Sequence, residues 1–375
     1  MSNALANMFD FRKLGFLKED NSAIGIDVGS SSVKVVQLKL KGGKAILETY
    51  GELALGTYGG QAVGQAVTLE VDKLTEAITD LFREANVTTR NAALSIPLRS
   101  SLLKVVDIPS FSEKKLNQII PIEARKYIPV PITEVALDWW VIPDSEFHGP
   151  EDETSADTGG EVTSHKKEVL IVAIHKETIN RYTELVSKLK LEANEFEVET
   201  FSSIRAVASH DITPMAILDL GASTSKLAIV DYGIIKVSHV IDKGGQDITH
   251  SISTSLGLTF DQAEKKKRLE GFDASGAGEL VSSTVEYIFY EVGRVIADFE
   301  RKYSRLVPKI ILTGGGTLLK GIVPLAQKTF QAEIIPGHAF NKTESPAFLA
   351  DILADAGPEF AVAIGLALRK LQETA

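Results

Sequence analysis

The chain has 375 residues, of which 44% are hydrophobic and 24% charged, a composition typical of a globular protein with two or three domains. Its formal net charge is −10 and it has no long basic run, which argues against nucleic acid as a partner. It has no cysteine, which excludes disulfides, thiol catalysis and cysteine-ligated metals, and suits a reducing cytoplasm. No stretch reaches the roughly 20 apolar residues that cross a bilayer.

Residues 1–21 are expected to form a flexible leader. The segment lacks the apolar centre of a signal peptide. It does mix Phe9, Phe11 and Phe16 with basic residues, so weak docking on a membrane or a partner stays open beside a partly ordered leader.

An internal repeat is the first informative feature. Residues 24–34 (IGIDVGSSSVK) and 217–226 (ILDLGASTSK) align at an aspartate, a glycine, a serine and a lysine. Each copy continues with an alternating β-branched strand, a glycine turn and a third strand. The same three-stranded meander therefore occurs twice, which predicts two related lobes that face each other.

A different α/β unit lies between the two copies. The spacing of its apolar residues predicts three strands and two helices, followed by a return strand at 196–199. These elements span 102–107, 113–127, 135–142, 169–174 and 178–189. Residues 144–165 are acidic and rich in Gly, Ser and Thr, which predicts a mobile loop within this insertion.

The chain turns helical after the second meander. Helical spacing is clearest at 262–269 and 280–303, and a closing helix is predicted at 359–372. A buried strand at 309–313 runs into Gly314, Gly315 and Gly316, and a helix interrupted near Pro324 is expected over 318–331.

The two Asp-x-Gly-x-Ser turns suggest phosphate binding. Glycine lets the backbone approach a ligand, successive N–H groups form an anion-binding nest, and hydroxyl groups donate to phosphate oxygens. One such hairpin alone is usually an ordinary turn, but two matched copies favour a polyphosphate held from both sides. The predicted phosphate-binding residues are Gly29, Ser30, Ser31, Ser32, Lys34, Gly221, Ala222, Ser223 and Thr224.

The aspartates of the repeat predict a cation. A carboxylate beside a phosphate is repulsive unless a cation lies between them, and Mg²⁺ needs only one or two nearby carboxylates. Asp27 and Asp219 suit this role, and either could instead orient an attacking water.

Taken in order, the two phosphate loops and the Gly-Gly-Gly loop resemble the actin, Hsp70 and sugar-kinase superfamily. The resemblance implies an α/β, two-lobed actin-like ATPase fold of duplicated RNase H-like lobes that binds ATP. Residues 244–249 and 263–267 resemble the helices beside the nucleoside in bacterial actin-like proteins, although a solvated charged helix face is the alternative. The implied nucleoside-binding residues are Gly244, Gly245, Glu264, Lys267, Gly314, Gly315, Gly316 and Leu318.

The position of the insertion resembles the cell-division protein FtsA and the related type IV pilus family PilM. Residues 95–97, 108–110 and 122–129 (IEARKYIP) resemble PilM segments, and the chain ends without the amphipathic helix usual in FtsA. The expected boundaries are 22–98 with 196–215 for subdomain 1A, 99–195 for subdomain 1C, and 216–375 for lobe two with subdomains 2A and 2B.

The PilM resemblance implies a cytoplasmic adaptor that binds ATP and Mg²⁺ and reaches the inner membrane through partners. The implied partner is the N-terminal tail of a PilN-like membrane protein, held as an extended peptide between 1A and 1C. Pilus motor ATPases and the platform protein are further candidates, and self-association stays open. The candidate groove residues are Leu102, Leu103, Val105, Ile119 and Tyr127.

Two other functions remain open from the sequence. One is an FtsA-like filament-forming protein. The other is a kinase of the same superfamily, which needs a general base, and no clear carboxylate offers itself although Glu197 and Glu199 lie near the expected hinge. No residue for orienting water stands out, so ATP turnover is left open.

Overall fold

The computed structural model describes residues 21–109, 111–143, 166–193, 196–209, 212–273 and 278–374. All of the expected leader except Asn21, and the acidic loop 144–165, lie outside these residues. Among the described residues, no helix is both long and apolar enough to span a bilayer.

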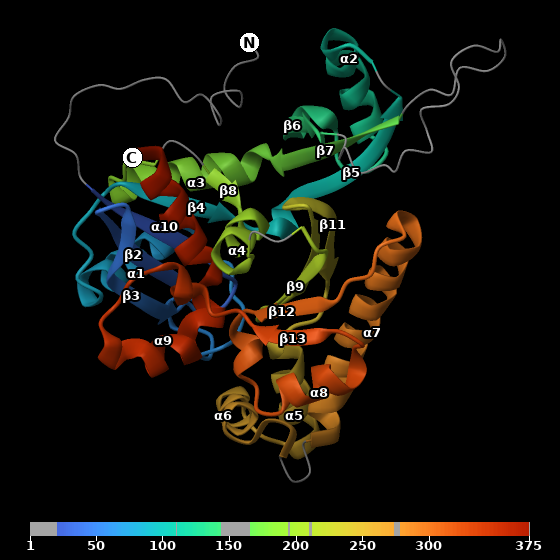
Figure 1. Ribbon diagram of the computed structural model, residues 1–375. Coiled ribbons are helices and arrows are strands. Elements are labelled where there is room, and N and C mark those ends of the chain that lie inside the picture. Colours follow the sequence, from blue (N-terminus) through green and yellow to red (C-terminus); the bar gives the residue numbers. More distant parts are fainter. Residues whose placement is uncertain are drawn as a thin grey trace, which may run out of the picture.

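A five-stranded sheet forms the centre of the first lobe (Figure 1). Its first three strands are the antiparallel meander predicted from the repeat, and two parallel strands follow in the order β3-β2-β1-β4-β8. Helices cover both faces, which is why β1 reads as a nearly continuous apolar run. The strands are β1 (Ser22–Val28), β2 (Ser32–Lys41), β3 (Lys44–Ala54), β4 (Ala92–Ile96) and β8 (Phe196–Val198).

The second sheet repeats this topology. Its order, β11-β10-β9-β12-β13, again places an antiparallel meander beside two parallel strands. The predicted duplication is therefore confirmed at the level of strand order. The strands are β9 (Met215–Leu220), β10 (Ser225–Asp231), β11 (Ile234–Ile241), β12 (Lys309–Thr313) and β13 (Glu333–Pro336).

Four helices bury the outer face of the second sheet, with Phe289 and Phe299 among the largest buried side chains. They are α5 (Gly245–Leu256), α6 (Phe260–Glu270), α7 (Gly278–Tyr303) and α8 (Ile322–Thr329). The helix expected over 318–331 is shorter than predicted, because a 3₁₀ turn at Gly315–Leu318 precedes α8. The predicted interruption near Pro324 is wrong: Pro324 lies in the first turn of α8, where a missing N–H is tolerated.

The insertion forms a third, three-stranded sheet of order β5-β7-β6, drawn at the top right of Figure 1. Leu116, Ile120 and Ala124 pack one helix onto its inner face. The elements are β5 (Ser101–Pro109), α2 (Glu113–Ala124), β6 (Val135–Val141) and β7 (Lys166–His175).

Two helices pack against a different subdomain from the one that the predicted boundaries assign to them. The last helix, α10 (Ala361–Thr374), lies on the first sheet rather than in lobe two, and Gly25 and Gly365 allow this contact. A Cβ at Gly365 would lie 1.9 Å from the carbonyl oxygen of Ser202, and one at Gly25 would lie 1.9 Å from that of Ala363. The chain thus crosses back to the first lobe at its end.

The second helix is α3 (Lys176–Leu189), which was assigned to the insertion. Together with α1 (Val71–Glu84) it covers the other face of the first sheet, through Tyr182 and Leu185. The apolar face of α3 matches the first sheet, so the separate packing unit of the insertion is limited to β5, α2, β6 and β7.

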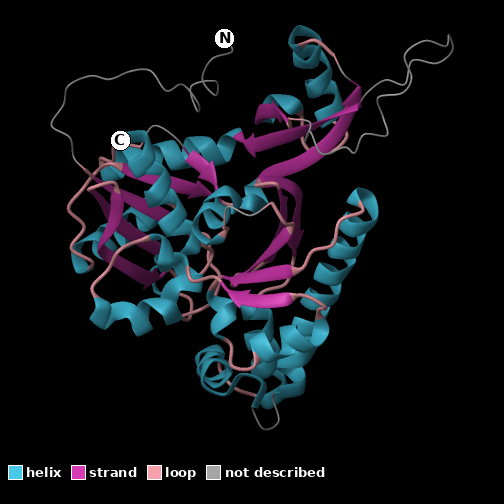
Figure 2. Cartoon of the chain, in the orientation of Figure 1, coloured by secondary structure: helices cyan, strands magenta, loops and turns pink. Residues whose placement is uncertain are grey.

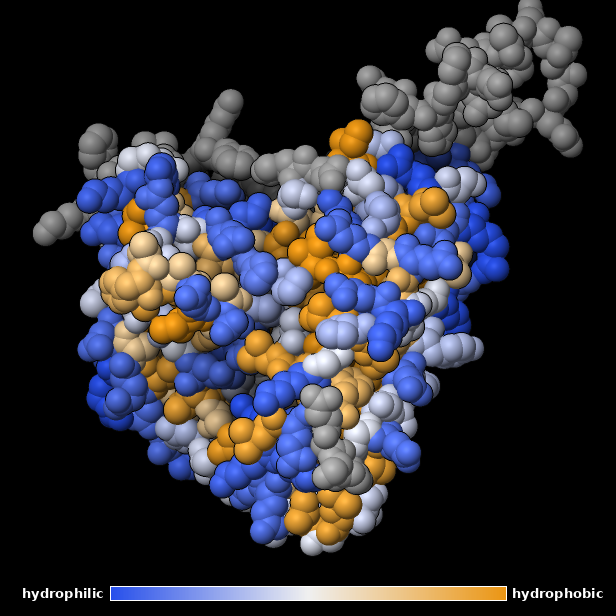
Figure 3. Space-filling view, turned by 60° about the horizontal axis from the view of Figure 1, so that its bottom comes forward, coloured by the Kyte–Doolittle hydropathy of each residue, from blue (hydrophilic) through white to orange (hydrophobic). Residues whose placement is uncertain are grey.

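An apolar cluster joins the two lobes behind the cleft. Leu98 and Val198 of lobe one pack with Ile217 and Ile235 of lobe two, and Leu103 from β5 joins them. The short helix α4 (Glu199–Val207) follows β8 and precedes β9 in the chain, and it lies between the two sheets in Figure 1 and in Figure 2. On the face drawn in Figure 3, hydrophobic residues form patches in the middle and at the lower end, with hydrophilic residues between them.

Candidate functional site

The two repeated turns have the same geometry. Between β1 and β2, the N–H of Gly29 donates to the carbonyl of Ser32 at 3.0 Å, and between β9 and β10 the N–H of Gly221 donates to that of Thr224 at 3.1 Å. A Cβ would lie 2.9 Å from the first of these oxygens and 2.7 Å from the second. Both turns therefore require glycine at this position.

Both turns open onto one cleft of about 670 Å³ between the lobes, which is the size of an ordinary ligand pocket. The cleft brings together the predicted phosphate-binding, nucleoside-binding and aspartate positions, with the single exception of Gly244. Gly244 lies behind the second turn, where a Cβ would be 2.5 Å from the carbonyl oxygen of Ala222, and its N–H donates to Asp247. Residues as far apart in the sequence as Asp27 and Leu318 therefore line the same cleft.

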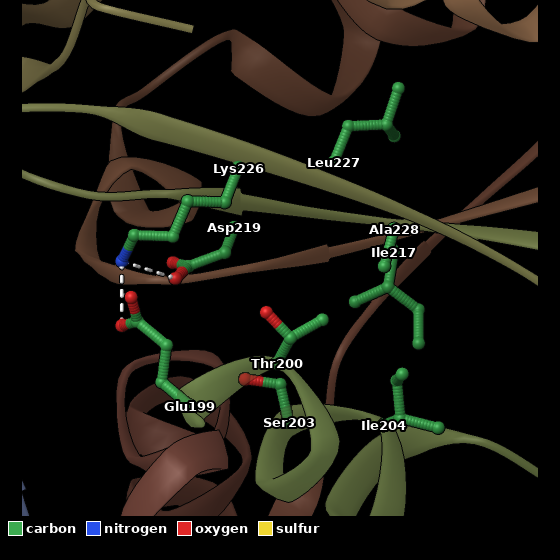
Figure 4. A pocket seen from close by; sticks show the side chains of 9 residues that line it. All are labelled: Glu199, Thr200, Ser203, Ile204, Ile217, Asp219, Lys226, Leu227 and Ala228. Atoms are coloured by element: carbon green, nitrogen blue, oxygen red, sulfur yellow. Dashed lines mark hydrogen bonds and ion pairs between the residues drawn. The ribbon is translucent and has the colours of Figure 1, made fainter. Parts of the chain in front are cut away.

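An ion-pair cluster forms one wall of the cleft. The ammonium of Lys226 lies 2.8 Å from Glu199, which comes from α4 of lobe one, and 3.1 Å from Asp219 on β9 of lobe two (Figure 4). The second carboxylate oxygen of Glu199 accepts the N–H of Leu98 at 2.6 Å. Burial alone would lower the pKa of Lys226, but Asp219 and Glu199 outweigh it and hold the pKa above its usual value. Lys226 therefore stays charged and joins the lobes.

Asp27 lies on the same wall and accepts a hydrogen bond of 2.9 Å from the Ser95 hydroxyl. Burial and the neighbouring Glu199 raise its pKa to about 6, although Lys34 and Lys226 act in the opposite direction. A carboxylate with a raised pKa lacks a sufficient counter-charge, so this site fits a cation. Among the described residues no group of three or more acidic or histidine side chains suits a metal, but Mg²⁺ with its own waters needs only one or two carboxylates.

Lys34 is held by the protein in this structure. Its ammonium lies 2.8 Å from Glu52 and donates to the Ser32 hydroxyl at 2.9 Å. A phosphate in the first turn would therefore compete with Glu52 for this lysine, and Glu52 is a cleft residue that the sequence analysis missed.

On the nucleoside side, the predicted pair Glu264 and Lys267 is engaged internally. Lys267 donates to the Gly245 carbonyl at 3.0 Å and the Thr249 hydroxyl at 2.9 Å, and lies 2.7 Å from Glu264. Glu264 also accepts from Thr249 at 2.6 Å and from Arg268 at 2.7 Å. All three protons of Lys267 are used, so its first role here is to fix α5 against α6.

Arg268 is the better exposed donor beside this network. Its Nε binds Glu264, while its side chain remains 64% exposed and lines the cleft. No motif in the sequence singled out Arg268, Glu52 or Glu359 because they approach the cleft only through packing of distant elements. Glu199 had a weak signal, its position at the end of the return strand.

A segment that we name the strap, residues 56–69 between β3 and α1, covers one side of the cleft. The N–H of Val67 donates to the carbonyl of Ser30 in the first turn at 2.9 Å, and the N–H of Ala66 donates to the Gln246 side chain of lobe two at 3.2 Å. Gly64 has φ +86°, and a Cβ there would lie 2.8 Å from the Glu264 carboxyl. The strap thus ties a phosphate-type turn of one lobe to the nucleoside-side helices of the other.

The five predicted partner residues do not form one groove. Side chains alternate along a strand, so Leu102 faces the core under α2 whereas Leu103 and Val105 point to the opposite face, and Leu103 is buried between the lobes. Ile119 packs partly against the core under α2. Tyr127 is the exposed member at 38%, with the Lys104 ammonium 5.8 Å from its ring centre.

The family described as type IV pilus assembly protein PilM matches residues 25–371. The chain belongs to the PilM family. This match covers both lobes, the insertion and α10, so the whole described architecture is that of the family.

Solved structures support the actin-like fold. A PilM–PilN type IV pilus biogenesis complex superposes with a TM-score of 0.77 at 24% identity, over 94% of this chain and 99% of that one. The ethanolamine utilization protein EutJ from Carboxydothermus hydrogenoformans gives 0.54 at 14% identity, over 98% and 99%. The predicted two-lobed actin-like fold is thereby confirmed.

Among curated proteins, the chain is similar to the cell division protein FtsA. It is 22% identical to FtsA of Enterococcus faecalis over 360 residues, which is 84% of this chain and 79% of that protein. FtsA of Bacillus subtilis is 21% identical over 359 residues, covering 83% and 77%. The predicted relationship of this PilM chain to FtsA is confirmed.

The raised pKa of Asp27 predicts that this carboxylate destabilises the metal-free protein. The pKa of Asp27 is about 6 in the folded protein and 3.8 for the free group. Above pH 6 the carboxylate is charged in both states and lowers the free energy of unfolding, whereas below pH 3.8 it is protonated in both states and has no effect. We expect Asp27→Asn to stabilise the metal-free protein by about 1–2 kcal/mol at pH 8, since partial solvation from the cleft reduces the ~3 kcal/mol of the full shift. Urea unfolding at pH 8 and pH 5 checks this, and a gain that grows toward pH 5 would contradict it.

The strap contact predicts a difference between two glycine variants. Gly60 and Gly64 both have positive φ, +68° and +86°, so alanine strains the backbone at either position. Only a Cβ at Gly64 meets lobe two, whereas one at Gly60 meets nothing within 4 Å. We expect Gly64→Ala to speed amide hydrogen exchange in the strap and in α6, with Gly60→Ala affecting the strap alone. Equal exchange in α6 for the two variants would show that the contact does not restrain the lobes.

Proposed function

We propose that this PilM protein binds ATP with Mg²⁺ between its lobes and acts as an adaptor in the inner-membrane platform of a type IV pilus or related secretion system. Nucleotide binding is supported by the pair of matched glycine turns, which face one cleft whose wall holds Asp27 and Asp219. Two turns of this kind suit a polyphosphate, and the opposed carboxylates suit its cation.

In this proposal, the N–H groups and hydroxyls of residues 29–32 and 221–224 bind the phosphates, and Lys34 exchanges Glu52 for a phosphate oxygen. Asp27 and Asp219 would hold Mg²⁺, which supplies the positive charge that neutralises the phosphates. The backbone of residues 314–316 lines the cleft and leaves room for a planar base, because Gly315 and Gly316 lack side chains. Arg268 lies exposed at the cleft and reaches the nucleoside more readily than Lys267.

The same geometry favours binding over rapid turnover. Hydrolysis needs an oriented water, and Glu199 is the cleft carboxylate placed beside both aspartates. Both of its oxygens already accept hydrogen bonds, from Leu98 and Lys226. Because both oxygens of Glu199 are already held by protein donors, it is poorly placed to orient a water, so we infer slow hydrolysis at most.

The proposed partner is the N-terminal tail of a PilN-like membrane protein. Support comes from the family and from the similarity to a structure solved as a PilM–PilN complex. Of the five predicted residues, Tyr127 is exposed for an extended peptide, next to Lys104 and beside the end of α2. Such a tail would place the protein at the cytoplasmic side of the inner membrane, within reach of motor ATPases and the platform protein. FtsA-like self-association is the alternative function, because FtsA proteins match most of the chain.

Calorimetric titration tests the nucleotide proposal. We expect Mg·ATP to bind the wild type and to bind at least about tenfold more weakly to Asp219→Ala or Lys34→Ala, since each removes a charge-assisted contact worth about 1.5–3 kcal/mol. Lys236→Ala is the control, since Lys236 pairs with Glu168 outside the cleft lining. Unchanged affinity in both cleft variants would refute the site, and equal loss in the control would point to a general loss of folding.

A peptide titration tests the partner proposal separately. We expect an apolar peptide from the N-terminus of a PilN-like protein to bind saturably, and Tyr127→Ser to weaken it by about tenfold, as loss of a buried aromatic anchor does. Phe348→Ser is the matched control, because Phe348 is 82% exposed on the opposite part of the molecule near α9 (Ala350–Ala356). Absence of peptide binding, together with Mg·ATP-dependent sedimentation of the chain, would favour the filament function instead.

A further inference from the structure

A second, much smaller cavity lies directly behind the ion-pair wall of the cleft. Its volume is about 10 Å³, which is the room that one water molecule needs. Glu199, Ser203, Asp219 and Lys226 line both this cavity and the main cleft, so these four side chains form the partition between them.

The cavity contains an unsatisfied hydroxyl group. The Oγ1 of Thr200 is buried and has no hydrogen-bond partner among the described residues, and Thr200 as a whole is only 8% exposed. Figure 4 shows the hydroxyls of Thr200 and Ser203 on the side of the cavity where Asp219 and Glu199 lie. Buried hydroxyls in folded proteins are nearly always hydrogen-bonded, to protein or to water.

The two walls of the cavity come from different lobes. Thr200, Ser203 and Ile204 belong to α4 of lobe one, whereas Ile217 and Asp219 belong to β9 of lobe two. Leu227 and Ala228 of β10 complete an apolar side that separates the cavity from the rest of the core. An occupant of this space therefore touches both lobes at the hinge.

We propose that one buried water occupies this cavity and bridges the Thr200 hydroxyl of lobe one to the Asp219 carboxylate of lobe two. The site offers the two to four polar partners that a buried water needs, from Thr200, Ser203 and Asp219. A monovalent cation is disfavoured because the Lys226 ammonium already provides the positive charge between the two carboxylates.

The bridge gives α4 a role in positioning Asp219. Asp219 is fixed from the cleft side by Lys226, and the water would fix it from the opposite side through Thr200. Because a water bridge is lost when its two walls separate, Asp219 would be held in place only while the lobes are as close as they are here. This role is independent of whether the cleft holds a nucleotide.

The test uses Thr200→Val, which keeps the shape of the side chain and removes the hydroxyl, with Thr200→Ser as the variant that restores it. Thr79→Val is the control, because Thr79 lies exposed on α1, where its hydroxyl bonds only the Thr75 carbonyl. Crystal structures at high resolution, with nucleotide-free full-length protein, should show one water in the cavity of wild type, Thr200→Ser and Thr79→Val, and none in Thr200→Val. Oxygen-17 relaxation dispersion should count one long-lived water fewer in Thr200→Val alone.

A dry cavity in the wild type overturns the proposal, and so does density whose contacts fit Na⁺ or K⁺. The bridging role has its own readout, amide exchange in β9 and α4. We expect the amide exchange rate in β9 and α4 to rise about fivefold in Thr200→Val and to stay unchanged in Thr200→Ser, since one hydrogen bond contributes about 1 kcal/mol. Loss of the water with unchanged exchange would refute the bridge. Because no measurement requires nucleotide, a failed titration with Mg·ATP leaves these results interpretable.

Discussion

The contact on which the arrangement of the site depends is the ion pair between Lys226 and Glu199. One partner comes from β10 of lobe two and the other from the start of α4 in lobe one, so the 2.8 Å contact joins the lobes at the wall of the cleft. Removing one partner of a buried ion pair costs about 3–5 kcal/mol, because the other charge is left without compensation. The lobes are therefore restrained at the position where the predicted cation-binding aspartates meet.

The backbone around this contact is packed so closely that it allows little adjustment. Gly365 of α10 lies against the Ser202 carbonyl of α4, and Glu197 accepts two hydrogen bonds from Arg205 on the same helix. The C-terminal helix thus fixes α4 on the first sheet, and α4 presents Glu199 to Lys226. This chain of contacts explains why the last residues must return to lobe one: without α10, the helix that carries the inter-lobe carboxylate would have no support on that side.

The repeat made much of this structure predictable. Matched Asp, Gly, Ser and Lys positions identify two turns whose geometry is set by local backbone rules, and Gly29 and Gly221, which are predicted to bind phosphate, both line the cleft. What could not be predicted are side chains that reach the cleft through tertiary packing, such as Glu52 and Arg268. The five predicted groove residues do not share one surface, because side chains alternate along a strand and Leu102 and Leu103 therefore face opposite ways. The predicted boundary of lobe two included α10, which packs on the first sheet. Helical spacing at 361–374 shows which face of this helix is apolar, but not which sheet that face covers.

The strap adds a second contact between the lobes, separate from the ion pair. It contacts the first turn through Ser30 and lobe two through Gln246 and Glu264, so the lobes are held both at the hinge and at the mouth. The two restraints differ in kind. The contact between Lys226 and Glu199 is ionic and buried, whereas the strap, among the described residues, reaches lobe two through one hydrogen bond, from Ala66 to Gln246, and through the close approach of Gly64 to Glu264. Separating the lobes at the strap should therefore cost less than separating Lys226 from Glu199, since one part-buried hydrogen bond is weaker than a buried ion pair.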